Sequence, residues 1–440
     1  MKFYHREQEL ELLNQTYEQS QLMAKMLVIT GRRRVGKTLL ALQHVEGKKY
    51  LYLFVSKKSE NLLCEEYLNQ IKSTFIDAPI FGEINTFKGI FSLLMTIAKA
   101  QAFILVIDEF QEFMSINPSV YSDIQHVWDL NKSTSKLQLI FLGSIYSLMH
   151  KIFEHAHEPL FGRADYLIHL KAFNPKEMFY ILKDYQQDTP EVLLNYYLYT
   201  GGMPRYMDIF LTQNIFSENA MIDFMLSGMS PFLDEGKNVL IEEFGKDYNV
   251  YFSILELIAT GYTTRADLES NLNRDVGGYL DRLENTYAVI SKFKPFDAKP
   301  NSRKQQYKIQ DLFLRFWFRF IYRYRSAVET GNFNYIKQIL FRDLKTYQGK
   351  ILESLFYDLF ALSQQYNILG VYWEKDGSNE IDLIGLNQLN KVLDIAEIKL
   401  NKNKISLKQL EEKAQNIAQR YAKYRIHYLA LSLEDIVRYV

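Results

Sequence analysis

A loop of eight residues, Gly31 to Thr38, restricts the fold of this chain more than any other feature. It reads Gly-Arg-Arg-Arg-Val-Gly-Lys-Thr, a spacing in which glycines let backbone N–H groups surround phosphate oxygens and a following helix adds its dipole. An apolar run, Met26 to Thr30, precedes the loop, and a helical stretch, Lys37 to Val45, follows it. A strand, a phosphate loop and a helix in this order predict a nucleotide-binding α/β domain.

The loop residues are predicted to bind ATP together with Mg²⁺. The ammonium of Lys37, a catalytic residue on this interpretation, is expected to reach the β- and γ-phosphates, and the hydroxyl of Thr38 is expected to hold Mg²⁺. The whole loop is expected to contact the nucleotide: Gly31, Arg32, Arg33, Arg34, Val35, Gly36, Lys37 and Thr38.

An apolar run that ends in two carboxylates supplies the second half of the expected site. Phe103 to Ile107 is followed directly by Asp108 and Glu109, and ligands of open α/β sheets bind at the carboxyl ends of strands. Asp108 is expected to order Mg²⁺ through water, and Glu109 to orient and polarise the attacking water. An acidic pair after a strand is by itself typical of a solvated loop. Beside the upstream phosphate loop it predicts ATP hydrolysis.

Short apolar runs in the first half of the chain predict a parallel sheet. They are Met26 to Thr30, Tyr50 to Val55, Phe103 to Ile107, Leu137 to Leu142 and Tyr166 to Leu170. The segments between them are mostly long enough for crossover helices, which gives the alternation of a doubly wound α/β domain. We predict a P-loop ATPase core over residues 1–172, a helical lid over 173–240, a winged helix over 241–330 and a small α/β domain over 331–440.

Two further polar residues lie beside the predicted strands. Ser144 follows the fourth run, where a polar side chain can sense the γ-phosphate. Arg163 comes just before the fifth run and is a candidate arginine finger, acting within its own subunit or toward a neighbouring one. A surface salt bridge is an equal alternative for Arg163.

Several segments of the sequence carry a resemblance to a known family. They are Phe3 with Arg6-Glu7-x-Glu9-Leu10, Gly31 to Thr38, Ile107-Asp108-Glu109, Gly143-Ser144, Leu160 to Arg163 and Gly201-Gly202-Met203-Pro204-Arg205-Tyr206. Together they resemble the archaeal-type ATPases of the AAA+ and STAND region of P-loop ATPases. The resemblance implies that Arg6 and Glu7 lie near the adenine, and that Pro204 and Arg205 lie in a lid that faces the nucleotide.

The segment 249–316 has the outline of a winged helix, with three short helices, a turn-rich stretch and a strand-like Gln305 to Ile309. A candidate wing carries basic residues that can contact phosphates, Lys292, Lys294, Lys299, Arg303 and Lys304. Asp281 and Glu284 share the expected recognition helix, so a role in packing is an equal alternative to DNA contact. The aromatic stretch Asp311 to Phe320 is predicted to be a core helix between domains.

The last hundred residues place acidic residues and a lysine near predicted strand ends. Glu397 and Lys399 share one face of a strand by its two-residue period, Asp382 lies on the adjacent hairpin strand, and Glu353 lies on a preceding helix. Carboxylates bind Mg²⁺ at a scissile phosphate, and a lysine steadies the charge that develops there. The arrangement resembles the PD-(D/E)XK nucleases, with Glu353, Asp382 and Glu397 as metal ligands beside Lys399. An ordinary surface hairpin is the alternative.

Composition excludes several classes of protein. Lys and Arg number 52, as do Asp and Glu, so any nucleic-acid contact must come from a local basic patch. The single cysteine, Cys64, rules out an internal disulfide and a cysteine-based zinc site. No apolar leader and no run of 18 apolar residues occur, so a cytoplasmic protein is expected.

Two functions lead among those that the sequence leaves open, and a mobile-element or defence ATPase is a third. The first is an ATPase whose nucleotide cycle repositions a winged helix and a nuclease-like domain on DNA. The second is a STAND-type switch in which bound ATP controls a protein partner and the nuclease-like domain is inactive. A homo-oligomer is compatible with both.

Overall fold

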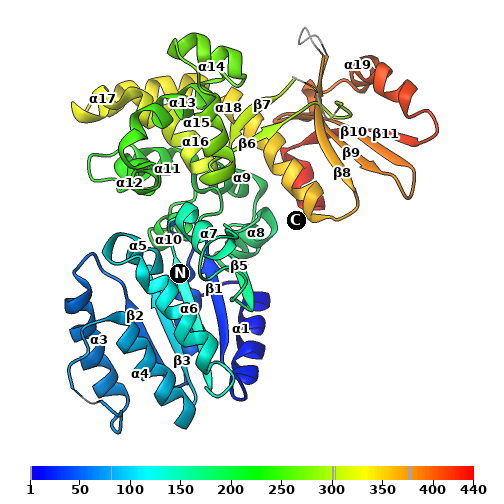
Figure 1. Ribbon diagram of the computed structural model, residues 1–440. Helices are drawn as coiled ribbons and strands as arrows, with labels where there is room; N and C mark the ends of the chain where they lie inside the picture. Colours follow the sequence, from blue (N-terminus) through cyan, green and yellow to red (C-terminus); the bar gives the residue numbers. More distant parts are fainter. Residues whose placement is uncertain (1, 81, 300–301, 303, 375–378) are drawn as a thin grey trace. The chain divides into compact units, whose positions relative to one another are not determined.

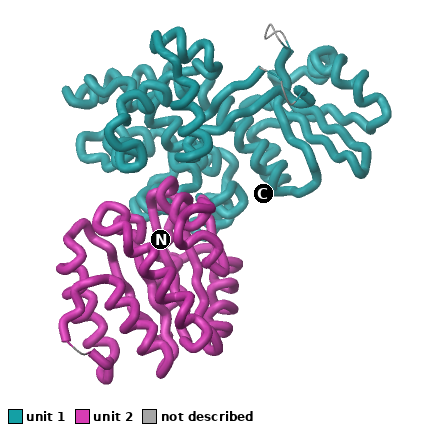
Figure 2. The backbone as a smooth tube through the Cα atoms, in the orientation of Figure 1, with its two compact units in different colours: residues 1, 172–440 teal, residues 2–171 magenta. Residues whose placement is uncertain are grey.

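The computed structural model describes residues 2–80, 82–299, 302, 304–374 and 379–440. The chain forms two compact units, residues 2–171 and residues 172–440 (Figure 2). Among the described residues, no helix combines the length and apolar character needed to cross a membrane.

The first unit is built on a sheet of parallel strands in the order β2-β3-β4-β1-β5. The strands are β1 (Lys25–Thr30), β2 (Tyr50–Phe54), β3 (Phe103–Asp108), β4 (Leu137–Gly143) and β5 (Tyr166–His169). β3 and β4 are buried along their whole length, as expected of strands covered on both faces. The predicted α/β fold and its strands are confirmed, and the order places the carboxyl ends of β3 and β4 beside the end of β1.

Helices cover both faces of this sheet (Figure 1). They are α1 (Glu7–Ser20), α2 (Lys37–Val45), α3 (Glu60–Thr74), α4 (Phe87–Ala100), α5 (Phe113–Ile116), α6 (Ser119–Asn131) and α7 (Tyr146–Glu154). On one face, α3, α4 and α6 pack an apolar core against alternate strand residues. On the other face, Gln138 of β4 bonds His44 of α2 and donates to the Leu13 carbonyl of α1. Cys64 is buried within the first core.

The second unit begins with a run of helices and a two-stranded antiparallel hairpin. The helices are α8 (Pro175–Asp184), α9 (Pro190–Thr200), α10 (Pro204–Thr212), α11 (Glu218–Met225), α12 (Phe232–Phe244), α13 (Tyr248–Thr260), α14 (Arg265–Leu272) and α15 (Gly277–Asp281), and the hairpin strands are β6 (Ile290–Phe293) and β7 (Gln306–Ile309). Between α9 and α10, Gly202 has a φ of 72°, and a Cβ there would lie 2.0 Å from the Phe173 carbonyl oxygen. Glycine is required at this turn.

The aromatic stretch after the hairpin is not one regular helix. It forms α16 (Leu312–Phe316), a π-helical turn (Trp317–Ile321) and, after a short 3₁₀ turn, α17 (Arg325–Glu329). The indole of Trp317 is fully buried and donates to the Leu233 carbonyl at 3.0 Å. The predicted core position is therefore correct, but the helix widens by one residue per turn where the large rings pack.

A four-stranded sheet and two helices end the chain, with the strand order β11-β10-β9-β8. The elements are α18 (Phe333–Leu362), β8 (Ile368–Trp373), β9 (Glu380–Asn387), β10 (Val392–Lys399), α19 (Leu407–Arg420) and β11 (Arg425–Ser432). β8, β9 and β10 are antiparallel neighbours, and β11 runs parallel to β10. α18 starts well before the predicted position near Tyr347, because Asn332 caps it by accepting from the Tyr335 N–H at 3.3 Å.

Candidate functional site

The phosphate loop lies where β1 ends and α2 begins, as predicted. Gly31 and Gly36 have φ angles of 152° and 94°, which side chains other than glycine rarely adopt. A Cβ on Gly31 would also lie 2.5 Å from the Leu170 carbonyl oxygen, so the loop is pressed against the end of β5. The two glycines of the motif are thus needed for the turn itself.

Lys37 points into the loop that precedes it. Its side chain is only 5% exposed, and its ammonium donates to the carbonyls of Gly31 at 2.8 Å and Arg32 at 3.1 Å. The cation is therefore held inside the curve of the loop, where backbone N–H groups at the start of α2 also favour negative charge.

Asp108 receives hydrogen bonds from two hydroxyl groups at the end of β3. Thr38 donates to Oδ2 at 2.9 Å, and Tyr52 of β2 donates to the same oxygen at 2.5 Å. The backbone N–H of Glu109 donates to Oδ1 at 2.8 Å. Burial, reinforced by Asp108, raises the pKa of Tyr52 well above its usual value, so its hydroxyl stays a donor. Sequence analysis missed Tyr52, because its strand reads Tyr-Leu-Tyr-Leu-Phe and nothing in it sets this tyrosine apart from the other aromatic residues.

Glu109 is held by both of its carboxylate oxygens. Its backbone is left-handed, with a φ of 53°. Ser144 donates to Oε1 at 2.9 Å, and Gln111 donates to Oε2 at 2.5 Å. The structure thus joins Glu109 to Ser144, which the sequence placed at the neighbouring strand end, and to Gln111, which the sequence did not single out.

Gln111 carries a buried atom with no visible partner. The side chain is 1% exposed, and its Oε1 atom accepts no hydrogen bond from any residue that the structure describes. A buried acceptor of this kind costs about 1–3 kcal/mol. Gly143 makes room for this amide, because a Cβ there would lie 2.6 Å from the same oxygen.

Arg6 and Glu7 lie at the start of α1. Arg6 is buried, adopts a φ of 73°, and donates to the Lys171 carbonyl at 2.5 Å just beyond β5. Glu7 is exposed. Arg6 therefore lies at the same edge of the sheet as the phosphate loop. Contact of either residue with adenine stays a prediction.

Arg163 lies at the opposite edge of the sheet. β5 pairs with β1, with Tyr166 beside Leu27, and the Asp165 N–H donates to the Met26 carbonyl. Arg163, two residues earlier, therefore lies near the start of β1. Its guanidinium pairs with Asp129 at 3.0 Å. The predicted role within its own subunit is wrong, because the sheet separates this arginine from the phosphate loop. A role toward a neighbouring subunit stays a prediction.

Pro204 and Arg205 begin α10 in the second unit. Arg205 pairs with Asp208 one helical turn later, at 3.2 Å, and is half exposed. Their contact with the nucleotide remains a prediction from the resemblance.

The second unit brings Asp382, Glu397 and Lys399 together. The Lys399 ammonium lies 3.0 Å from Asp382 and 3.1 Å from Glu397. The Ile398 N–H donates to Asp382 at 2.8 Å, and Lys413 of α19 lies 3.3 Å from Glu397. Both carboxylates are buried. The cluster is an ion network rather than a solvated hairpin surface.

Glu353 lies close enough to this network for their charges to interact. Burial, with a further contribution from Asp382, raises the pKa of Glu353 to about 7. Within the described ranges, no three His, Cys, Asp or Glu side chains are arranged to hold a metal ion. Asp382 and Glu397 have the right chemistry for Mg²⁺, but lysines already balance their charges. Metal binding by Glu353, Asp382 and Glu397 stays a prediction.

One basic residue of the expected wing already has an acidic partner. Lys292 pairs at 3.1 Å with Glu284, which belongs to the predicted recognition helix. Lys299 and Lys304 are exposed, whereas Arg303 lies outside the described residues. Part of the predicted positive charge is therefore neutralised within the unit.

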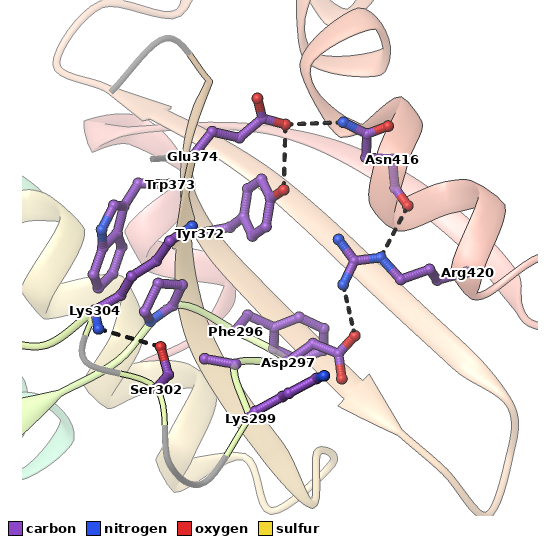
Figure 3. Close-up of a pocket in the computed structure, with 12 residues that line it drawn as sticks. Phe296, Asp297, Lys299, Ser302, Lys304, Tyr372, Trp373, Glu374, Asn416 and Arg420 are labelled. Carbon is purple, nitrogen blue, oxygen red and sulfur yellow. Dashed lines mark hydrogen bonds and ion pairs between the residues drawn. The ribbon is translucent and has the colours of Figure 1, made fainter. Parts of the chain in front are cut away.

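A surface hollow lies beside the wing, between β8 and α19 (Figure 3). Asn416 donates to Glu374 at 2.9 Å, and Arg420 pairs with Asp297 at 3.0 Å. Phe296 packs in the floor with Tyr372. Because the polar groups of this hollow already bond one another, we assign no site to it.

Comparison with known proteins agrees with this geometry. Residues 3–210 match a family described as an ATPase domain predominantly from Archaea. The first part of the chain is thus similar to the ATPase domains of that family. Residues 317–417 match a family of archaeal and bacterial proteins of unknown function.

Individual relatives cover most of the chain. An uncharacterized protein of Methanocaldococcus jannaschii is 28% identical over 415 residues, which are 90% of this chain and 87% of that protein. The Walker-type ATPase of Pyrococcus abyssi superposes with a TM-score of 0.53 at 18% identity, covering 72% of this chain and 96% of that one. The ORC2 protein of Aeropyrum pernix, in its ADPNP-ADP complexes, gives 0.48 at 15% identity, covering 74% and 94%. The likeness to the Pyrococcus protein confirms the fold.

Proposed function

We propose that the first unit binds ATP with Mg²⁺ and hydrolyses it. One observation carries the proposal: the phosphate-loop residues Lys37 and Thr38 meet Asp108 and Glu109 at one edge of the sheet, with Thr38 and Asp108 2.9 Å apart. A hydroxyl and a carboxylate at this distance suit Mg²⁺, which prefers oxygen ligands.

Each residue has a distinct task in this reaction. Lys37 would leave the loop carbonyls for the β- and γ-phosphates and offset their negative charge. Thr38, with Asp108 through water, would hold Mg²⁺, which when bound neutralises phosphate charge. Glu109 would accept a hydrogen bond from the attacking water and align it with the γ-phosphorus. Tyr52 fixes the carboxylate of Asp108 from the neighbouring strand.

Hydrolysis requires Glu109 to accept a hydrogen bond from the attacking water beside its present partners. Each of its oxygens already accepts one bond, from Ser144 and Gln111, so these donors compete with the water for the remaining lone pairs. Ser144 also lies where a γ-phosphate could recruit its hydroxyl. We infer that nucleotide binding frees Glu109 by drawing Ser144 away.

We further propose that ATP turnover drives action of the second unit on nucleic acid. Three helices followed by the hairpin β6–β7 are typical of a winged helix. The order α18-β8-β9-β10-α19-β11 and the trio Asp382, Glu397 and Lys399 resemble the PD-(D/E)XK nucleases. Cleavage would need Lys399 to release one carboxylate to a metal.

A regulatory switch is the second candidate, and the locked state of Glu109 favours it. If the bonds from Ser144 and Gln111 hold Glu109 away from the water, turnover would be slow, and bound ATP would persist and could control a protein partner. The two candidates differ in turnover and in their response to DNA.

Hydrolysis of ATP by the purified protein, with and without single-stranded, duplex or branched DNA, tests the proposal. We expect turnover that DNA stimulates and that Lys37→Ala abolishes, with DNA cleavage scored in the same reactions and lost in Glu397→Ala. Retained nucleotide with neither stimulation nor cleavage would reject action on nucleic acid and favour the switch.

Subunit mixing tests the remaining role of Arg163. If Arg163 acts on a neighbour, a mixture of Arg163→Ala and Lys37→Ala subunits regains hydrolysis that neither variant shows alone. No recovery, with assembly confirmed by light scattering, would leave Arg163 as a partner of Asp129 only.

A further inference from the structure

A cavity of about 750 Å³ lies within the second unit. Its walls come from the end of α13, the hairpin β6–β7, α16 and the π-helical turn, α18, and the strands β8 and β9. It is separate from the phosphate loop, and the functions proposed above do not use its cationic wall.

Charged groups are distributed unevenly around this cavity. The cations that line it are Lys294, Lys308, Arg315, Arg319 and Lys350, and the carboxylates are Glu353, Glu380 and Asp382. All three carboxylates belong to α18 or to β9. Positive charge dominates the wall formed by β7, α16 and the π-helical turn, which favours an anion there.

Tyr347, on α18, carries a buried hydroxyl donor beside this wall. It is 3% exposed, and its hydroxyl makes no hydrogen bond with any part of the chain that the structure describes. Burial raises the pKa of Tyr347 to about 12, against the opposing effect of Arg315 and Arg319. The hydroxyl therefore keeps its proton and can donate to an anion.

The two arginines lie over the ring of the same tyrosine. The guanidinium carbons of Arg315 and Arg319 are 5.9 Å and 5.6 Å from the ring centre of Tyr347. Arg319 is fixed by a bond from Nη1 to the Ala259 carbonyl at 3.1 Å and by Asp343 at 3.9 Å. Its Nε is buried and finds no acceptor among the described residues. The Tyr347 hydroxyl and Arg319 Nε, two donors without acceptors, thus lie near the guanidinium of Arg315 along the cavity.

Aromatic side chains line another part of the cavity. Phe293 of β6 and Trp373 of β8 meet edge to face, with ring centres 5.6 Å apart, and Tyr357 of α18 lies in the same lining. All three are partly exposed. Nucleobases stack on such rings whatever their sequence, provided that they are unpaired.

We propose that this cavity binds single-stranded nucleic acid, with a backbone phosphate on Arg315, Arg319 and Tyr347 and unpaired bases against Phe293 and Trp373. A phosphate supplies the acceptors that Tyr347 and Arg319 lack. The proposal deepens the proposed action of the second unit on nucleic acid and rests on it, but it does not depend on ATP hydrolysis. It places a strand beside Glu353 and Asp382.

Binding of a fluorescent single-stranded oligonucleotide to the full chain, measured by anisotropy in EDTA without ATP, tests the site. We expect Arg319→Gln to weaken binding about tenfold or more, and to reduce the slope of log K against log salt by about 0.7, the loss of one phosphate contact. Tyr347→Phe should weaken binding about threefold to tenfold.

Tyr347→Phe removes only a hydroxyl without a visible partner, so it should not lower the unfolding temperature. A loss of binding in this variant therefore reports on the site and not on folding. The matched charge control is Arg325→Gln, on α17 and outside the cavity, for which binding should change less than about twofold. Oligonucleotide binding that both cavity variants leave intact would overturn the site while leaving action on nucleic acid possible.

Three other outcomes would also contradict the proposal. No binding of any oligonucleotide would reject the site together with nucleic acid as the target, but not ATP hydrolysis. Tighter binding of a phosphopeptide than of the oligonucleotide, lost in the same variants, would assign the cavity to a protein partner. Equal affinity for duplex and single strand would reject the stacking on Phe293 and Trp373.

Discussion

Asp108 in the first unit and Asp382 in the second are both buried carboxylates at strand ends, yet their neighbours differ in kind. Asp108 accepts from the neutral hydroxyls of Thr38 and Tyr52, so its negative charge is available to a cation. Asp382 is paired with the ammonium of Lys399 at 3.0 Å. Neutral donors leave the charge of Asp108 available to a metal ion. At Asp382, Lys399 must move away before a metal ion can bind.

The largest expected effect concerns Lys37. The ammonium of Lys37 would exchange the loop carbonyls for the β- and γ-phosphates as its partners. Lys37→Ala should therefore lower ATP hydrolysis at least about 100-fold. Lys99→Ala, an exposed position on α4, is the matched control and should leave hydrolysis within about twofold. Hydrolysis by Lys37→Ala within about twofold of the wild type would show that the first unit is not the ATPase site.

The second prediction concerns Glu353, whose pKa is raised to about 7. The folded state holds this proton more tightly than the unfolded chain, so the resulting stability is present below about pH 4.5 and is lost as pH rises through about 7. Glu353→Gln should therefore stabilise the protein more at pH 8 than at pH 5, by about 1–3 kcal/mol. Urea unfolding at the two pH values measures this, and a difference independent of pH would contradict it.

The third prediction concerns Gln111, which donates to the catalytic candidate Glu109. Gln111→Met removes one bond to Glu109 together with the unsatisfied Oε1, so turnover should rise about twofold to fivefold and stability should stay within about 1 kcal/mol. Steady-state hydrolysis and thermal unfolding test this. Slower turnover would mean that Gln111 positions Glu109 for the reaction instead of restraining it.

Tyr52 should give the smallest effect. Tyr52→Phe removes one of the bonds that orient Asp108, so the Mg²⁺ concentration for half-maximal hydrolysis should rise about twofold to threefold. A titration with Mg²⁺ at saturating ATP measures it. An unchanged midpoint would show that Thr38 and the Glu109 N–H orient the carboxylate without Tyr52.

Local patterns made much of the first unit predictable. The apolar runs located β1 to β5, and α2 spans Lys37–Val45 as expected, because glycine spacing and hydrophobic period act over a few residues. Tyr52 and Gln111 could not be placed, since the first depends on β2 pairing with β3 and the second on the left-handed turn at Glu109. Arg163 was misjudged for another reason: it precedes β5, and the start of a parallel strand lies at the edge of the sheet opposite the phosphate loop.

The second unit shows where such reasoning ends. The sequence grouped Asp382, Glu397 and Lys399 correctly through the two-residue period of a strand. It gave no sign that Arg315 and Arg319, in a stretch interpreted as core, would share a cavity with Tyr347. That cavity depends on the π-helical turn and on the long α18, which are products of packing.

Single-turnover hydrolysis of ATP by the wild-type protein and by Glu109→Gln, alongside nucleotide affinity, tests the central claim most directly. The amide keeps the size of the side chain but replaces one accepting oxygen by an NH₂ donor, so it cannot polarise water as a carboxylate does. We predict nucleotide affinity within about threefold and hydrolysis at least about 100-fold slower. Unchanged hydrolysis would contradict the assignment of Glu109 and, with it, the proposed ATPase site.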